Sequence, residues 1–138
     1  MPTLTVQLRN IPDTEAAAGW AGGHTIVVDR AEGKAGGMGL GFNGGQLLAL
    51  AIGGCFCNDI RYVAHEMGIA IATIEVDVEL SLRGEPLVAS GATMRVRATA
   101  ADPSADIAAV IRRAEQDSTV ANSMKRGFPV VTIPAVPG

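Results

Sequence analysis

Apolar and polar residues alternate in three stretches of the chain, which is the pattern of β-strands with one buried face. The first stretch is residues 3–9, and a short β-branched run follows at residues 24–29. The strictest alternation covers residues 73–83, and residues 92–99 alternate again after the Gly84-Glu85-Pro86 turn. We therefore expect two N-terminal strands and an antiparallel strand pair in the middle of the chain.

The polar face of the middle pair carries opposite charges. Glu75, Asp77 and Glu79 lie on one strand, and Arg95 and Arg97 lie on the other. Cross-strand ion pairs of this kind contribute about 0.2–1 kcal/mol each. This pattern indicates a solvated face rather than a functional site.

A long helix is predicted between the two groups of strands. Asn43 and Gln46 have the spacing of a reciprocal capping pair, and the sequence is then apolar nearly all round through Cys57. That half of the helix is expected to be buried on every side. One sheet and one neighbouring helix cannot easily cover it in so small a protein, so we expect a partner chain.

The second half of this helix is expected to be amphipathic and to end at Gly68. The apolar positions at helical spacing are Phe56, Ile60, Val63, Ala64 and Met67. The polar positions expected largely on the other side are Asp59, Arg61, His65 and Glu66.

Two helices and a strand are predicted after the middle pair. Asp102-Pro103 has the pattern of a helix start, and Ser118 can cap a short further helix that ends at Gly127. The buried stripe of the first of these helices is expected to be Ile107, Val110, Ile111 and Ala114. Residues 128–133 have the pattern of a last strand. The predicted order is β-β-α-β-β-α-α-β, an α+β fold in a single domain over residues 1–138.

Composition narrows the class of protein. Of the 138 residues, 48% are hydrophobic, so the chain can form a packed core rather than a disordered segment. The net charge of −3 and the scattered Lys and Arg residues argue against a nucleic-acid partner. The first residues lack a targeting pattern, so the expected location is the cytoplasm. The apolar stretch 40–57 contains Asn43, Gln46 and five glycines, which favours a buried helix over a membrane span.

Cys55 and Cys57 are the two cysteines. At about 100° per residue, helix positions i and i+2 point about 200° apart, so these thiols cannot easily form a disulfide or share a metal ion. His24 and His65 fit surface or half-buried positions better than ligand positions. We therefore expect no metal and no cofactor.

A free cysteine is most often a small buried hydrophobic residue, and a reactive one needs a nearby cation or helix N-terminus. Asp59 lies four residues after Cys55, where its negative charge would disfavour a thiolate, whereas Arg61 lies four residues after Cys57. Local spacing therefore does not nominate Cys55 as a nucleophile, and both interpretations stay open on spacing alone.

Several segments resemble the OsmC/Ohr family, and its OsmC-like branch in particular. Residues 41–48, which lead into Gly53-Gly54-Cys55-Phe56-Cys57-Asn58-Asp59, resemble the loop and buried helix that carry the family's peroxidatic cysteine. The strand at residues 24–29 and the glycine-rich loop after it are also similar. Residues 114–130 resemble the helix of the second cysteine and the following strand. The resemblance covers most of the chain.

This resemblance implies an OsmC-like fold, with antiparallel sheets packed on long central helices in an intertwined homodimer. It also implies that a thiolate at Cys55 reduces organic hydroperoxides or hydrogen peroxide and becomes a sulfenic acid. In the family, a second cysteine then forms a disulfide, and a dithiol reductant restores the enzyme.

The sequence departs from the family pattern at several positions. Ser118 stands where the second cysteine is expected, Gly45 where the Ohr branch has a glutamate, and Gly44 where proline is usual. Arg9 and Arg30 are the candidates for the activating arginine. An external thiol reductant, or Cys57, would then resolve the sulfenic acid. The alternative is a catalytically decayed dimer that binds a small apolar ligand or has a non-enzymatic role, with Ser118 as a plain helix cap.

Overall fold

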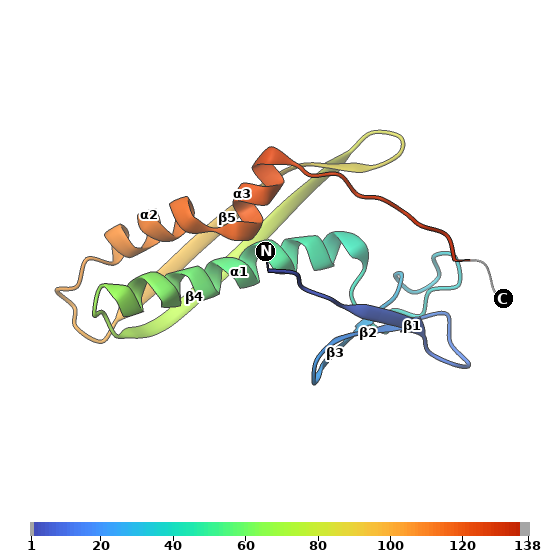
Figure 1. Ribbon diagram of the computed structural model, residues 1–138, viewed down its shortest axis with the longest axis horizontal. Helices are drawn as coiled ribbons and strands as arrows, with labels where there is room; N and C mark the ends of the chain where they lie inside the picture. Colours follow the sequence, from blue (N-terminus) through green and yellow to red (C-terminus); the bar gives the residue numbers. More distant parts are fainter. Residues whose placement is uncertain (1, 136–138) are drawn as a thin grey trace. The chain divides into compact units, whose positions relative to one another are not determined.

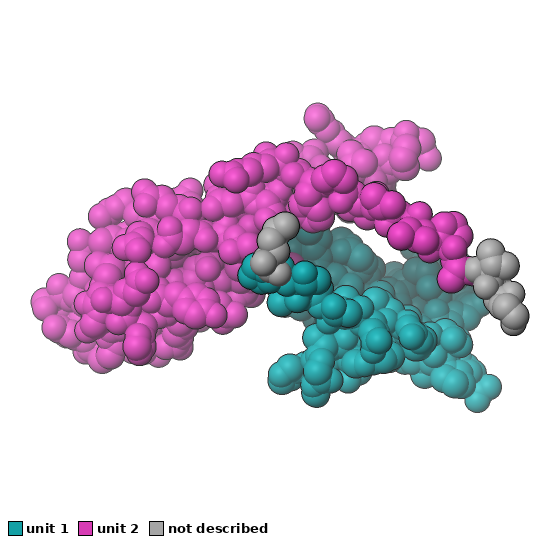
Figure 2. Space-filling model, in the orientation of Figure 1, with its two compact units in different colours: residues 1–50 teal, residues 51–138 magenta. Residues whose placement is uncertain are grey.

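The computed structural model describes residues 2–135 (Figure 1). Its elements are β1 (Gln7–Asn10), β2 (Ala17–Ala21), β3 (His24–Val28), α1 (Gly44–Glu66), β4 (Ile71–Arg83), β5 (Val88–Ala100), α2 (Ile107–Asp117) and α3 (Thr119–Arg126). The chain divides into two compact units, residues 1–50 and residues 51–138, and Figure 2 colours them separately. Helix α1 begins in the first unit and continues into the second.

The first unit contains a three-stranded antiparallel sheet in the order β1-β2-β3. The sequence predicted its two outer strands but not β2, whose residues Ala17–Ala21 include a central glycine and no β-branched residue. Pairing on both sides holds β2 in the sheet despite this weak intrinsic preference. β1 is also shorter than predicted, because only Gln7–Asn10 pairs with β2.

The second unit is built on the antiparallel pair of β4 and β5. Helices α1 and α2 pack on it and form the core with its inward-facing side chains (Figure 1). The buried core residues are Phe56, Ile60, Val63, Ala64, Val110 and Ala114. The predicted stripe of the long helix is confirmed at Phe56, Ile60, Val63 and Ala64, but not at Met67, which lies beyond the helix end and is 42% exposed. The stripe of α2 is confirmed at Val110, Ala114 and Ile111.

The predicted charge pairing between the two long strands is confirmed. Glu75 lies opposite Arg97, and Asp77 lies opposite Arg95. An Nη1 atom of Arg97 is 3.3 Å from a carboxylate oxygen of Glu75, and both side chains are exposed. The exposed Glu75–Arg97 pair contributes little to stability, as expected for a solvated face.

Both predicted ends of the long helix are confirmed. The Asn43 amide donates to Gln46 Oε1 at 3.0 Å, and the Gln46 amide donates to Asn43 Oδ1 at 2.9 Å. This reciprocal pair satisfies backbone donors that have no partner within the helix. After the helix ends at Glu66, Gly68 has a φ of +67°, which glycine adopts without steric cost.

The predicted burial of the first half of α1 on every side is wrong within one chain. Leu50 is 48% exposed, and Ala51 and Gly54 are exposed as well. The physical reason is that the chain's own β4, β5 and α2 cover only the side of the helix that carries Phe56 and Ile60.

Two predictions near the C-terminus are also corrected. Helix α2 begins at Ile107, because Asp106 caps it by accepting the Ala109 amide at 3.0 Å. Asp102 instead accepts the Ser104 amide in the preceding turn, and this bond holds the pKa of Asp102 below 3.8. Residues 128–133 form no strand, since no other segment within the described chain pairs with them.

Among residues 2–135, α1 is the one helix that is long and apolar enough to cross a membrane. In the structure it is the central helix of a packed core, and it buries Phe56, Ile60 and the carboxyl group of Asp59.

Candidate functional site around Cys55

Cys55 lies near the middle of α1 and is half-buried. Its Sγ atom donates a hydrogen bond to Oδ2 of Asp59, with 3.6 Å between the two atoms. The two residues are four apart in the helix, so their side chains project from the same face one turn apart. A thiol and a carboxylate therefore form a pair on the side of α1 that borders the core.

Asp59 is only 8% exposed, which corrects the prediction that it lies on the polar side of the helix. A carboxyl group is rarely buried unless a partner offers it a hydrogen bond, and the Cys55 thiol is such a partner. Sequence reasoning noted the four-residue spacing but missed the buried pair. The signal was an acidic residue directly before the buried Ile60 in an apolar stretch.

Gly53 sets the distance between this part of α1 and strand β4. A Cβ atom on Gly53 would lie 2.8 Å from Cγ2 of Val78, closer than side chains approach without movement. At Gly54 an added Cβ atom would meet nothing within 4 Å. The first of the two glycines is thus needed for close packing at the Cys55 segment, and the second is not.

Cys57 is also half-buried, and both thiols are free. Both lie in the continuous helix α1, so they point away from each other as the spacing predicts. Within residues 2–135, no group of three or more His, Cys, Asp and Glu side chains is arranged to hold a metal ion.

Ser118 stands between α2 and α3 and is fully buried. The sequence predicted it as a helix cap, and its position before Thr119 fits, but its side chain makes no capping bond. Its Oγ atom has no hydrogen-bond partner in the described chain. The prediction of a plain side-chain cap is therefore wrong, and the buried hydroxyl needs another explanation.

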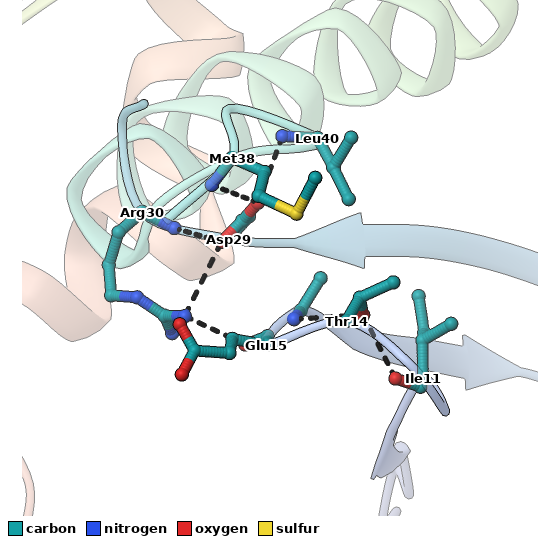
Figure 3. A network of polar contacts seen from close by, with 8 residues as sticks. Ile11, Thr14, Glu15, Asp29, Arg30, Met38 and Leu40 are labelled. Atoms are coloured by element: carbon teal, nitrogen blue, oxygen red, sulfur yellow. Dashed lines mark hydrogen bonds and ion pairs between the residues drawn. The ribbon is translucent and has the colours of Figure 1, made fainter. Parts of the chain in front are cut away.

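In the first unit, a polar network surrounds Asp29 at the end of β3 (Figure 3). Its carboxylate accepts the Arg30 amide at 2.7 Å, the Leu40 amide at 3.0 Å and the Met38 amide at 3.1 Å. The Leu40 bond is the largest cause that holds the pKa of Asp29 below 3.8, while burial opposes the shift. These bonds close the glycine-rich loop that leads to α1.

The two candidate activating arginines also lie in the first unit. Arg30 is 3.6 Å from Oδ1 of Asp29 and donates to the Glu15 carbonyl at 2.8 Å. Arg9 donates to the Leu8 carbonyl at 2.7 Å, and its guanidinium lies 5.9 Å from the centre of the Trp20 ring. Both guanidinium groups thus have partners within their own unit, and their activating role stays a prediction.

Comparison with known proteins decides the family. The model of the family described as OsmC-like protein matches residues 36–133, which include Cys55 and Ser118. The chain belongs to the OsmC-like protein family. No match is found among the curated proteins.

Solved structures confirm the OsmC-like fold. An OsmC-like protein from Vibrio cholerae has a TM-score of 0.73 at 12% identity, over 89% of this chain and 94% of that chain. The organic hydroperoxide resistance protein OsmC of Legionella pneumophila has a TM-score of 0.66 at 20% identity, over 91% and 90% of the two chains. The organic hydroperoxide resistance protein OhrB of Bacillus subtilis has a TM-score of 0.62 at 21% identity, over 89% of this chain and 90% of that chain.

In this OsmC-like protein, the site predicted from the sequence is thus a cysteine paired with a buried carboxylate. Cys55 and Asp59 come from one helix turn, and Ser118 occupies the junction of α2 and α3. The hydrogen bond gives the Cys55 thiol a carboxylate oxygen as a nearby proton acceptor.

Proposed function

We propose that this protein reduces hydroperoxides through Cys55, with an external thiol as reductant. Support comes from its membership of the OsmC-like family and from two proteins of similar fold that are organic hydroperoxide resistance proteins. The observation that carries the proposal is the position of Cys55, which is half-buried in α1 within the stretch that the family model matches.

In the proposed reaction, Asp59 takes the thiol proton as the Cys55 sulfur attacks the outer oxygen of the hydroperoxide. The O–O bond breaks, and the leaving alkoxide takes that proton from Asp59 and departs as the alcohol. Cys55 becomes a sulfenic acid, so the sulfur is oxidised by two electrons and the peroxide is reduced by two. General acid–base help of this kind contributes about 10²–10⁴-fold to a rate.

The sulfenic acid must then be reduced without a second cysteine at position 118. A thiol from outside condenses with it, which forms a mixed disulfide and releases water. A second thiol molecule breaks this disulfide and restores Cys55. Cys57 is the alternative resolving group, but it would require local unwinding of α1, because the two side chains diverge.

The activating cation and the dimer belong to the same proposal. Arg9 and Arg30 are the candidates on this chain, and a partner chain in a homodimer is another source. Exposed apolar side chains support a partner, among them Phe128, Val130, Val131 and Ile133 at 62–85% exposure. Light scattering coupled to size-exclusion chromatography tests the homodimer, which the proposal places in the cytoplasm.

Peroxide consumption tests the activity. Purified protein is mixed with cumene hydroperoxide and excess dithiothreitol, and the remaining peroxide is followed with time. We expect turnover by the unmodified protein, turnover by Cys57→Ser, and none above background by Cys55→Ser. Equal peroxide consumption by all three proteins would overturn the proposal. Loss of consumption in Cys57→Ser alone would show that the nucleophile is Cys57 and not Cys55.

Two observations favour a second candidate function, that of a non-enzymatic OsmC-like protein that binds a small apolar ligand. The position of the resolving cysteine holds a serine, and the described partner of the Cys55 thiol is a carboxylate rather than a cation. This candidate predicts that Cys55→Ser leaves the function and the cellular phenotype intact.

A further inference from the structure

The Cys55 thiol has a different polar neighbour on each side along the surface of α1. Helix residues turn by about 100° each, so Asp59 lies about 40° from Cys55 in one direction and Asn58 about 60° away in the other. Asp59 is 8% exposed, whereas Asn58 is exposed. The half-buried thiol therefore has a buried carboxylate on its inner flank and an exposed amide on its outer flank.

The outer flank of Cys55 is open beside Gly54. Gly54 is exposed, and a Cβ atom added to it would meet nothing within 4 Å in the described chain. Asn58 lies four residues after Gly54 on the same face, and helical side chains lean toward the N-terminus of their helix. The Asn58 amide is thus directed over the turn that holds Gly54 and Cys55. A molecule that approaches the sulfur over Gly54 comes next to this amide.

Reduction of a hydroperoxide benefits from a hydrogen-bond donor at the leaving oxygen. As the Cys55 sulfur forms its bond to the outer oxygen, the O–O bond breaks and negative charge develops on the inner oxygen. Donors aimed at developing charge lower the barrier to a reaction. Arg9 and Arg30, the two candidate cations, have partners within the first unit. The side-chain amide of Asn58 carries two N–H donors beside the thiol, and it stays neutral across the working pH range.

We propose that Asn58 is a catalytic residue whose side-chain amide donates a hydrogen bond to the leaving oxygen of the hydroperoxide. This role rests on the proposed peroxidase function and adds a second group to it. Asp59 accepts the thiol proton and returns it to the leaving alkoxide. Asn58 stabilises the charge on that oxygen and transfers no proton. The departing alcohol therefore carries the proton that began on Cys55, and the sulfur keeps the outer oxygen as a sulfenic acid.

Two reactions of the same thiol test this role, each followed on the Cys55 peptide by mass spectrometry. Oxidation by cumene hydroperoxide has a leaving oxygen, whereas alkylation by iodoacetamide has none. We expect Asn58→Ala to lower the second-order rate constant of oxidation by about 10–100-fold, since a donor that water can reach is worth less than one in a closed site. The alkylation rate should stay the same at each pH. Equal loss in both reactions, or loss in neither, would overturn the role.

Matched variants separate the donor from the other properties of the side chain. Gln116→Ala removes an exposed amide from α2 and should keep both rates. Asn58→Gln keeps the donor and should recover part of the oxidation rate, whereas Asn58→Asp offers a negative charge without a donor and should react more slowly than Asn58→Ala. Tyr62, 70% exposed one turn further along α1, is the competing donor. Loss of oxidation in Tyr62→Phe but not in Asn58→Ala would contradict the role of Asn58.

The basicity of the leaving oxygen provides an independent test. Peracetic acid releases a carboxylate, which is far less basic than the alkoxide from cumene hydroperoxide and needs less stabilisation. The fold-loss of Asn58→Ala should therefore be several-fold smaller with peracetic acid. An equal loss with both oxidants would contradict a hydrogen bond to the leaving oxygen. An unmodified protein whose Cys55 reacts with neither oxidant would instead refute the proposed function itself, so the two failures are distinguishable.

Discussion

The Sγ atom of Cys55 and the Oδ2 atom of Asp59 lie 3.6 Å apart on one face of α1, and Asp59 is buried while Cys55 is half-buried. Two negative charges so close together would repel each other in a poorly solvated place. Transfer of the thiol proton to the carboxylate avoids this repulsion, because the total charge of the pair stays the same. The proposed reaction therefore uses Asp59 as the acceptor of the thiol proton.

Replacement of Asp59 by Asn tests this role. An amide cannot take the thiol proton, so we expect the rate of cumene hydroperoxide reduction to fall by about 100-fold or more. The exposed Asp77 of β4 offers a matched control, and Asp77→Asn should retain the full rate. An unchanged rate in Asp59→Asn would show that the reaction does not need the carboxylate. A higher rate would show that the carboxylate opposes the reaction.

The adjacent glycines of α1 give opposite predictions for stability. Gly54→Ala should raise the free energy of unfolding by up to about 1 kcal/mol, because alanine favours the helix and its Cβ atom meets no neighbour. Gly53→Ala gains the same preference but collides with Val78, and overpacking of this kind costs about 1–3 kcal/mol. Urea denaturation should therefore place Gly53→Ala below Gly54→Ala in stability. The reverse order would contradict the packing of α1 on β4.

Asp29 should make the glycine-rich loop sensitive to acid. Its folded-state pKa is lowered below 3.8, chiefly by the Leu40 amide. The carboxylate therefore stabilises the fold above pH 3.8, and this contribution is lost as the pH falls through the lower folded-state value. In NMR titrations the amide signals of Met38 and Leu40 should move with a midpoint below 3.8.

Asp29→Asn should abolish that titration and leave one or more of the loop amides without an acceptor. Asp102→Asn serves as the control, because Asp102 bonds to Ser104 in another turn and should affect only that region. If the Met38 and Leu40 signals titrate unchanged in Asp29→Asn, then the bonds drawn in Figure 3 do not hold the loop.

The sequence predicts those helices and strands in which the order of apolar and polar residues matches the buried and exposed faces. The alternation of Glu75 and Val76 along β4, the capping pair of Asn43 and Gln46, and the core stripe with Val110 all follow from local periodicity. Strand β2 was missed because its stability comes from its two neighbours rather than from its own side chains.

The site was only partly predictable, because its key contacts depend on tertiary packing. Spacing put Cys55 and Asp59 on one face of the helix, but the burial of Asp59 follows from the position of α1 against the sheet. Likewise, the position of Ser118 in the sequence predicts an ordinary helix N-cap. Its unpaired state follows from the way in which α2 and α3 meet. The family resemblance supplied the role of Cys55, which local spacing did not.

Trapping of the sulfenic acid tests the central proposal most directly. The reduced protein is treated with one equivalent of cumene hydroperoxide in the presence of dimedone, digested and examined by mass spectrometry. Cys57→Ser and Cys55→Ser serve as matched controls. We predict a dimedone adduct on Cys55 in the unmodified protein and in Cys57→Ser, and no adduct in Cys55→Ser. A Cys55 that stays unmodified and open to alkylation under excess peroxide would contradict the account.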